Sequence, residues 1–180
     1  TGNVAMEVSD AAGMLMMNVR QRVWSRPILD SLDISPDILP PIVGSSEVAG
    51  TITAEAAEAT GLTPGTPVVG GGADNACGAV GSGVVVAGRG MVSLGTSGVV
   101  LAHLAKPKVV TEGTVHMFNS CVPGEFYMMG VTLSAGLSLS WLRSRLGLED
   151  VSYDVMTKAA ESVPPGSRGL VFLPYLTGER

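Results

Sequence analysis

The sequence predicts an α/β protein in which buried strands lead through tight turns into helices. The stretch from Pro67 to Gly83 carries the clearest signal, because the apolar pair Val68 and Val69 precedes three consecutive glycines and a helix of small residues. The composition agrees with this pattern: 46% of the residues are hydrophobic, 4% are aromatic and 15% are charged. Such a composition is typical of a well-buried core of strands and helices.

The first half of the chain predicts short elements separated by turns. We expect strands at residues 4–8, 14–19, 48–52 and 68–69, and helices at 28–32, 53–58 and 73–86. The turn from Asp10 to Gly13 should join the first two strands as a hairpin or a tight connection. The last of these helices contains Gly and Ser, which are poor helix formers, so close packing against another element must hold it.

The pattern changes to strands after Gly88-Arg89-Gly90, which is the expected internal boundary. The second half predicts strands at residues 91–94, 99–104, 115–122, 126–131 and 170–173, and helices at 132–145 and 153–163. The loop from Gly95 to Gly98 and the turn at Pro123-Gly124 should close two hairpins. The helix at 132–145 is apolar over a broad face, which predicts deep burial.

Charge and cysteine content argue against several classes of function. The formal net charge of -5 argues against nucleic-acid binding, which needs clustered Lys and Arg. The longest uncharged runs, at 90–105 and 126–142, are too short and too polar for comfortable membrane spans. The two cysteines, Cys77 and Cys121, do not form a secreted disulfide framework and favour a reduced cytoplasmic compartment, although a single bridge between them is compatible with the sequence.

Asp74 is the candidate catalytic residue. It follows the three glycines and stands beyond the end of a strand, where open α/β sheets place their ligands. A carboxylate at this point could accept the proton of an alcohol that attacks a phosphate, because phosphoryl transfer needs a group that activates or positions its nucleophile. The alternative is that Asp74 is only the N-cap of the helix, a position at which Asp is preferred. The spacing alone leaves both roles open.

The loop Gly95-Thr96-Ser97-Gly98 is the candidate phosphate site. Its glycines could expose backbone N–H groups to an anion and its hydroxyls could add donors, whereas the alternative is an ordinary hairpin turn. Two other phosphate-binding patterns are absent. The dinucleotide fingerprint would need a glycine where the chain has Asn75, and no lysine follows a glycine loop as the Walker A motif requires.

Other polar residues carry weaker signals. Asp10 is expected in a tight turn, from which it could reach a ligand. His103 and His116 have no metal-ligand spacing with each other or with the cysteines, so both are expected to be strand residues. The charged pair Glu179 and Arg180 follows an expected buried strand, and it could either line a cleft or form a surface ion pair.

Three motifs in this order resemble those of the FGGY carbohydrate kinases. They are Gly70-Gly71-Gly72-Ala73-Asp74-Asn75-Ala76-Cys77-Gly78-Ala79-Val80-Gly81, Ser93-Leu94-Gly95-Thr96-Ser97-Gly98 and Phe172-Leu173-Pro174-Tyr175-Leu176-Thr177-Gly178-Glu179-Arg180. The turn Ser9-Asp10-Ala11-Ala12-Gly13 extends the resemblance to nearly the whole chain. The chain departs from the family pattern at Ala73, where Gly is expected, and at Cys77, where Ala is expected.

The resemblance implies a ribonuclease H-like fold of the actin/hexokinase type, with two lobes. Residues 1–88 would then be the end of the N-terminal sugar-binding lobe, and residues 89–180 the start of the C-terminal nucleotide-binding lobe. ATP and Mg²⁺ are the implied cofactors, and a sugar is the implied acceptor. D-xylulose is the expected sugar; the alternatives are ribulose, gluconate or glycerol as acceptor, or a non-catalytic binding module of the same fold.

The resemblance also implies roles for individual residues. Asp74 would be the general base that takes the proton of the sugar hydroxyl, and Asn75 beside it would contact the sugar. Gly95 and Thr96 would contact the phosphates of ATP, together with Ser97 of the same loop. Asp10 is the weaker candidate for sugar binding.

The resemblance does not extend to every part of an FGGY kinase. Missing from this sequence are the family's first phosphate loop, with an Asp that helps to hold Mg²⁺, and the glycine motif that binds adenosine. The chain has no initial Met and no signal peptide in residues 1–20. We therefore expect an internal piece of a longer cytoplasmic protein, inactive alone, with no nucleic-acid or membrane partner; the full-length protein could be a homodimer.

Overall fold

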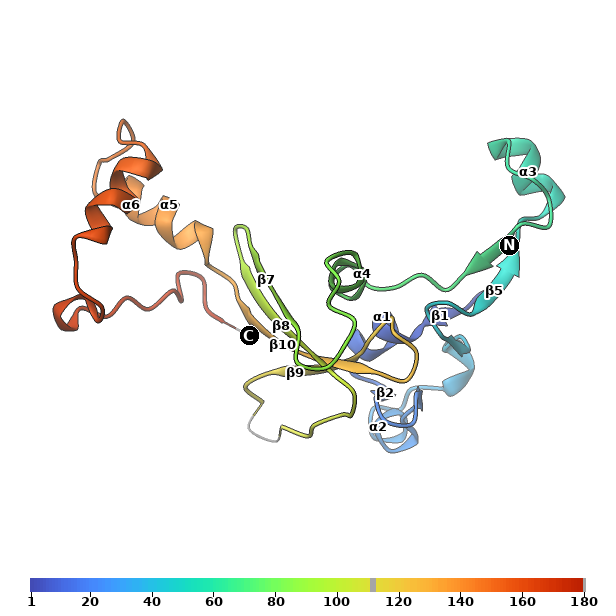
Figure 1. The fold of residues 1–180 in the computed structure, drawn as a ribbon. Helices are drawn as coiled ribbons and strands as arrows, with labels where there is room; N and C mark the ends of the chain where they lie inside the picture. Colours follow the sequence, from blue (N-terminus) through green and yellow to red (C-terminus); the bar gives the residue numbers. More distant parts are fainter. Residues whose placement is uncertain (111–112, 180) are drawn as a thin grey trace. The chain divides into compact units, whose positions relative to one another are not determined.

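The computed structural model describes residues 1–110 and 113–179, which form two compact units (Figure 1). The first unit consists of Thr1–Met91 and Leu101–Gly130, and the second of Val92–Val100 and the residues from Val131 onward. Strands β7 (Gly90–Leu94), β8 (Gly98–Leu104) and β10 (Phe126–Thr132) cross this division, so each contributes residues to both units.

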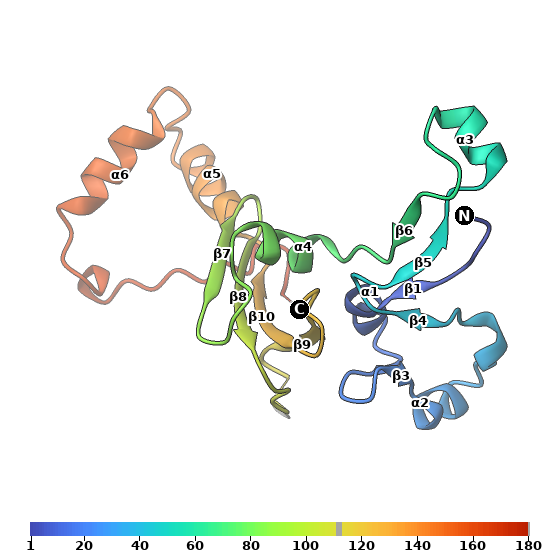
Figure 2. The ribbon, with the colours of Figure 1, turned by 45° about the vertical axis from the view of Figure 1, so that its right-hand side comes forward.

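The first unit contains short strands and helices. In chain order they are β1 (Met6–Glu7), α1 (Val8–Gly13), β2 (Met17–Asn18), β3 (Val23–Trp24), α2 (Arg26–Ser31), the 3-10 helix η1 (Pro36–Ile38), β4 (Ile42–Val43), β5 (Val48–Thr51), α3 (Ala54–Thr60), β6 (Pro67–Val69) and α4 (Asp74–Gly81). Strand β1 pairs in parallel with β4, and β5 pairs with β6 in antiparallel orientation (Figure 2). Strands β2 and β3 form a further antiparallel pair. The expected strand, glycine turn and helix are present as β6 and α4, but α4 ends at Gly81 and not near residue 86.

The hairpin or tight connection expected at Asp10 to Gly13 is wrong, because this segment belongs to helix α1. Glu7 caps the helix, and its carboxylate accepts the backbone N–H groups of Ser9 at 2.8 Å and Asp10 at 3.1 Å. These bonds satisfy amides that the start of a helix otherwise leaves unpaired. Strand β2 pairs with β3 and not with the segment that precedes α1.

A four-stranded sheet has the order β7-β8-β10-β9, with β9 at His116–Asn119. The antiparallel pair β9 and β10 places Phe126 opposite Asn119. Both expected hairpins are present, since β7 neighbours β8 and β9 neighbours β10. His103 and His116 are strand residues, as expected. The imidazole of His103 is buried, and its Nε2 lies 2.5 Å from Oε2 of Glu125.

Small residues bring α4 into the core of the first unit. Ala76 and Ala79 are buried and pack with Leu101 of β8 and Tyr127 of β10. Because alanine has no side chain beyond Cβ, the helix can approach its neighbours closely and leave little void. The ring of Phe118 in β9 stacks on that of Tyr127, with 5.2 Å between centroids.

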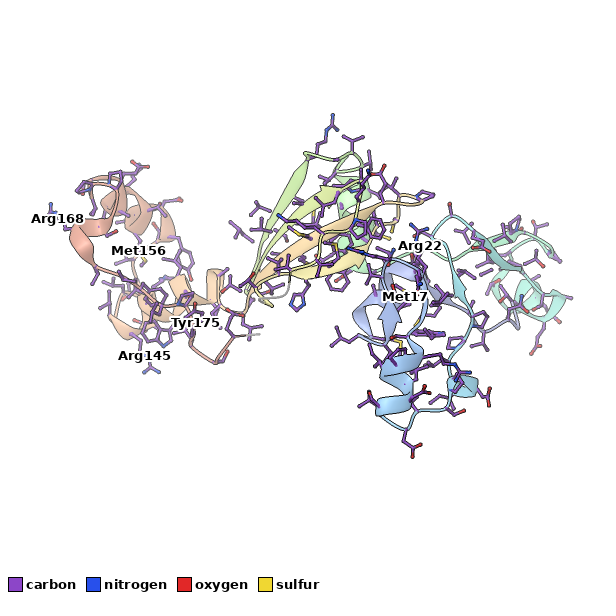
Figure 3. All side chains as sticks on the ribbon, turned by 90° about the horizontal axis from the view of Figure 1, so that it is seen from below. Met17, Arg22, Arg145, Met156, Arg168 and Tyr175 are labelled. Carbon is purple, nitrogen blue, oxygen red and sulfur yellow. The ribbon has the colours of Figure 1, made fainter. Side chains whose placement is uncertain are left out.

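A second cluster packs α1 against β2 and β9. It consists of Val8, Ala11 and Ala12 of α1 with Met17 of β2, and Phe118 packs against it as well. Figure 3 labels Met17 in this part of the chain, together with Arg22, whose guanidinium carbon lies 5.9 Å from the ring centroid of Phe126. Phe118 therefore contacts the clusters of both α1 and α4, the two helices that carry candidate site residues.

The second unit contains α5 (Gly136–Arg145), α6 (Tyr153–Glu161) and the 3-10 helix η2 (Ser167–Gly169), besides the ends of strands. Aromatic contacts connect its parts. The ring centroids of Trp141 and Phe172 lie 6.0 Å apart, and the guanidinium of Arg143 lies 4.7 Å from the ring centroid of Tyr153. Among the helices that the structure describes in either unit, none is long and apolar enough to cross a membrane.

Three expectations for the second unit are wrong. The helix expected at 132–145 begins at Gly136, because Thr132 still belongs to β10. No residue of α5 is buried, and Trp141 is 36% exposed. Residues 170–173 are not a strand, because no described strand pairs with them, and their side chains are exposed.

Candidate active site

A buried carboxylate, that of Glu7, lies at the centre of the candidate active site in the first unit. Its Oε2 accepts the N–H and the hydroxyl of Ser9 at 2.8 and 2.5 Å and the N–H of Asp10 at 3.1 Å. Its Oε1 accepts the hydroxyl of Ser45 at 2.5 Å. Glu7 is 6% exposed, and donors on both oxygens offset the cost of burying its charge.

Ser9 connects this carboxylate to the start of α4. Its hydroxyl donates to Glu7 and accepts the backbone N–H of Ala73 at 2.9 Å. Ala73 is the N-cap residue of α4 and forms no capping bond with its own side chain. The Ser9 hydroxyl therefore binds the backbone at the point where α4 begins, and the buried position of Ser9 holds that point in place.

Asp74 is the first helical residue of α4 and is exposed. The alternative that Asp74 is only the N-cap of the helix is wrong, because the N-cap residue is Ala73. The Asp74 carboxylate accepts the backbone N–H of the next residue, Asn75, at 2.6 Å and its side-chain amide at 3.1 Å, both through Oδ1. Asp74 thus presents an exposed carboxylate directly after the N-cap residue whose backbone N–H Ser9 binds.

The buried phenol of Tyr127 lies within electrostatic range of the same carboxylates. Burial is the main cause that raises the pKa of Tyr127 well above its usual range; Cys121 and then the charges of Asp74, Glu7 and Asp10 raise this pKa further. A phenol with a raised pKa stays protonated near neutral pH, so Tyr127 can donate a proton in a hydrogen bond but does not act as a base.

Asp74 and Asp10 both lie in the first unit. Asp10 is exposed in the first turn of α1, and not in a tight turn as expected. Sequence reasoning missed Glu7 and Tyr127. A carboxylate directly before a helix start is a capping signal that could have indicated Glu7, whereas Tyr127 depends on the pairing of β10 and has no local signal.

The loop between β7 and β8 lies in the second unit. The N–H of Gly95 donates to the Ser97 carbonyl at 2.8 Å, so this amide is used within the loop. The carbonyl of Thr96 accepts the N–H of Ala135 at 2.9 Å, and the carbonyl of Gly95 accepts the N–H of Gly136, also at 2.9 Å. The loop is therefore fixed on the start of α5, while Thr96 and Ser97 are exposed and offer their hydroxyl groups.

Glu179 also binds within the second unit. Its carboxylate accepts the hydroxyl of Thr132 at 2.9 Å and the backbone N–H of Leu133 at 3.1 Å. Glu179 thus fixes the chain where β10 ends. Arg180, the other member of the charged pair considered above, lies outside the described residues.

Metal-binding side chains are dispersed over the described part of the chain. Within residues 1–110 and 113–179, His, Cys, Asp and Glu side chains form no group of three or more that could hold a metal ion. None of these residues is therefore assigned to Mg²⁺.

Two family matches cover most of the sequence. Residues 1–81 match the N-terminal domain of the FGGY family of carbohydrate kinases, and residues 90–180 match the C-terminal domain of that family. The chain therefore belongs to the FGGY family of carbohydrate kinases. The resemblance seen in its motifs is confirmed.

Curated relatives are sugar kinases. The xylulose kinase of Bacillus subtilis is 42% identical over 180 residues, and that of Lactococcus lactis is 44% identical over 181 residues. A gluconokinase of Bacillus licheniformis is 32% identical over 186 residues, which cover 97% of this chain. The first two matches cover this whole chain, and in all three the chain spans 36% of the relative's length.

Solved structures of sugar kinases have the same fold. A xyloylose kinase from Brucella ovis matches with a TM-score of 0.88 and 37% identity, over all of this chain and 37% of the other. The ligand-bound xylulose kinase from Lactobacillus acidophilus also has a TM-score of 0.88, at 27% identity, over all of this chain and 36% of the other. These neighbours have the actin/hexokinase-like fold, so the predicted fold class is confirmed.

The hydrogen bond from the Ala73 N–H to the Ser9 hydroxyl should contribute to the stability of the protein. Ser9→Ala leaves the N–H of Ala73 without its partner, whereas Oε2 of Glu7 keeps the backbone N–H groups of Ser9 and Asp10. An unsatisfied group of this kind costs about 1–3 kcal/mol. We expect the free energy of unfolding of the full-length protein to fall by about this amount in chemical denaturation. Ser46→Ala is the matched control, because Ser46 is an exposed serine of the same unit. A Ser9→Ala variant as stable as the control would contradict the role given to Ser9.

Proposed function

We propose that the full-length protein transfers a phosphoryl group from ATP to a hydroxyl of a sugar, with D-xylulose as the acceptor. The observation that carries the proposal is the exposed Asp74 carboxylate at the start of α4, directly after Ala73, whose backbone N–H donates to Ser9 of the buried pair Ser9 and Glu7. Membership of the FGGY family supports the reaction class. Xylulose kinases among the relatives support the choice of sugar.

In the proposed reaction Asp74 is the general base. The acceptor hydroxyl donates its proton to the carboxylate as its oxygen attacks the γ-phosphorus of ATP. A new P–O bond forms, the bond to the β-phosphate oxygen breaks, and ADP leaves with that electron pair. Because Oδ1 of Asp74 already accepts the amides of Asn75, Oδ2 is the oxygen that takes the proton.

Two further side chains are proposed to orient the sugar. Asn75 fixes the Asp74 carboxylate through its side-chain amide and contacts the sugar from the same helical turn. Asp10 is exposed at the start of α1 and accepts a sugar hydroxyl as a second carboxylate. Sugar hydroxyls are donors, which a carboxylate accepts well.

The loop Gly95-Thr96-Ser97 is proposed to hold the phosphates of ATP. Its contribution comes from the hydroxyls of Thr96 and Ser97, because the Gly95 N–H is used within the loop. Mg²⁺ would neutralise charge on the transferred phosphate. On this proposal residues 1–88 belong to the sugar-binding lobe and residues 89–180 to the nucleotide-binding lobe.

A gluconate kinase is the second candidate. The 32% identity to the Bacillus licheniformis gluconokinase favours it over other FGGY acceptors, but the higher identity to xylulose kinases favours the pentulose. Measurement of ADP release by the full-length protein with D-xylulose, ribulose, gluconate and glycerol decides between these acceptors. Absence of turnover with all four would favour a non-catalytic binding module.

Asp74→Asn tests the base directly. Asparagine keeps the shape and an acceptor for Asn75 but cannot take the proton, and loss of a general base typically costs about 10²–10⁴-fold in rate. We expect kcat of the full-length enzyme to fall within that range, with the unfolding midpoint unchanged because Asp74 is exposed. Asp154→Asn is the control, since Asp154 holds a first-turn position in α6. An unaltered kcat in Asp74→Asn would sink the assignment.

Thr96→Val tests the phosphate loop. Valine keeps the shape and removes the hydroxyl, and hydrogen bonds to charged groups contribute about 1.5–3 kcal/mol. We expect the KM for ATP to rise roughly tenfold to hundredfold, while the KM for the sugar stays the same. Ser144→Ala, at an exposed position of α5, serves as the comparison variant. If the KM for ATP were the same in both variants, Thr96 would have no phosphate contact.

The 180-residue chain alone is proposed to be inactive, because it spans 36% of its curated relatives' length and lacks the first phosphate loop and the adenosine motif of the family. We expect no detectable ADP release with any of the four sugars. Isothermal titration of this chain with ATP supplies the second measurement. Tight ATP binding together with turnover would overturn this proposal.

A further inference from the structure

The two cysteines of the chain lie beside each other around Gly72. A Cβ atom built on Gly72 would overlap the sulfur of Cys121 and would lie 3.1 Å from the sulfur of Cys77. The thiol of Cys77 also donates to the Gly72 carbonyl at 3.4 Å. Only a glycine therefore leaves room at position 72 for both sulfurs, and both cysteines are free thiols.

Solvent can reach this pair of thiols. Both cysteines line a cavity of about 490 Å³, together with Ser45, Gly71 and the apolar Val69 and Val80. Cys77 is exposed and Cys121 is partly buried. Burial is the main cause that raises the pKa of the Cys121 thiol, and neighbouring Cys77 raises that pKa further, while a hydrogen bond with Ser45 lowers it.

We propose that Cys77 and Cys121 are an oxidation site, at which a peroxide converts the two thiols into a reversible disulfide. The thiol of Cys77 gives up its proton, and its thiolate attacks one oxygen of hydrogen peroxide. The O–O bond breaks, a sulfenic acid forms, and the leaving hydroxide takes up the proton as one water. The thiol of Cys121 then loses its proton and its sulfur attacks that of Cys77; the S–O bond breaks, and the leaving hydroxide with that proton is the second water. Two thiols are oxidised and one peroxide is reduced, and a dithiol reductant reverses the change.

The position of the disulfide determines its consequence. Cys77 lies one helical turn after Asp74 in α4, and Cys121 follows β9 in the turn that leads to β10. Closing the S–S bond to about 2.05 Å draws these segments together and removes the thiol donor to Gly72. We expect kcat to fall about tenfold or more, because displacing a catalytic group by about 1 Å can cost up to 10²-fold. This consequence, though not the disulfide, rests on the proposed function.

Peptide mapping of the full-length protein tests the disulfide. The protein is treated with equimolar hydrogen peroxide, blocked with iodoacetamide and digested with trypsin without reduction. Trypsin does not cut before proline, so Cys77 lies in the peptide 23–89 and Cys121 in the peptide 109–143, and each peptide holds one cysteine. We expect these two peptides as one cross-linked species that dithiothreitol separates. Two separately alkylated peptides after peroxide would overturn the proposal.

Kinetics of the same samples test the consequence. Peroxide should lower kcat of the wild type and dithiothreitol should restore it. Cys77→Ala should be insensitive to peroxide, and Cys121→Ala should form no cross-link. A cross-linked enzyme with undiminished kcat would overturn the proposed effect on α4. An enzyme that is inactive even when reduced would count against the kinase assignment, while the peptide map would still decide the disulfide.

Discussion

The first unit depends on the hydrogen bonds that the buried carboxylate of Glu7 accepts. Its two oxygens hold the start of α1 and the hydroxyl of Ser45, and through Ser9 they hold the start of α4. A buried charge is tolerated only when its hydrogen-bonding capacity is met, so these segments must take up fixed positions together. Asp74 is exposed to solvent, yet its backbone position follows from this buried network.

The second unit uses a carboxylate for a similar purpose. Glu179 binds the hydroxyl of Thr132 and the N–H of Leu133, and the carbonyls of Gly95 and Thr96 receive amides from the start of α5. Main-chain groups that the ends of strands and helices leave free are thereby paired, because an unpaired main-chain amide or carbonyl away from water costs a folded chain free energy. The exposed hydroxyls of the loop are then positioned by a backbone that is itself fixed.

Glycine and alanine in the motif around Asp74 serve packing as well as turning. Ala76 and Ala79 bring α4 close to Leu101 and Tyr127, and Gly72 leaves space for the sulfur of Cys121. A larger side chain at any of these positions would push α4 away from its neighbours, because protein interiors leave few voids. The same close packing brings the thiols of Cys77 and Cys121 together, and Cys77 lies one helical turn after Asp74, the proposed base.

The sequence by itself determined the motifs, the family and most hairpins, because strands, glycine turns and small-residue helices are encoded by neighbouring residues. It also indicated Asp74, but it left open whether that residue was only a cap. The tertiary structure places Ala73 at the N-cap of α4, where the Ser9 hydroxyl accepts its backbone N–H, and Asp74 at the next position. The tertiary structure also decided the burial of Tyr127. It decided the helical form of α1 as well, because the carboxylate of Glu7 accepts the N–H groups of Ser9 and Asp10 at the start of this helix. The sequence could not show that α5 has no buried residue. The apolar periodicity of a helix indicates which face can be buried, but burial itself requires another part of the chain to cover that face.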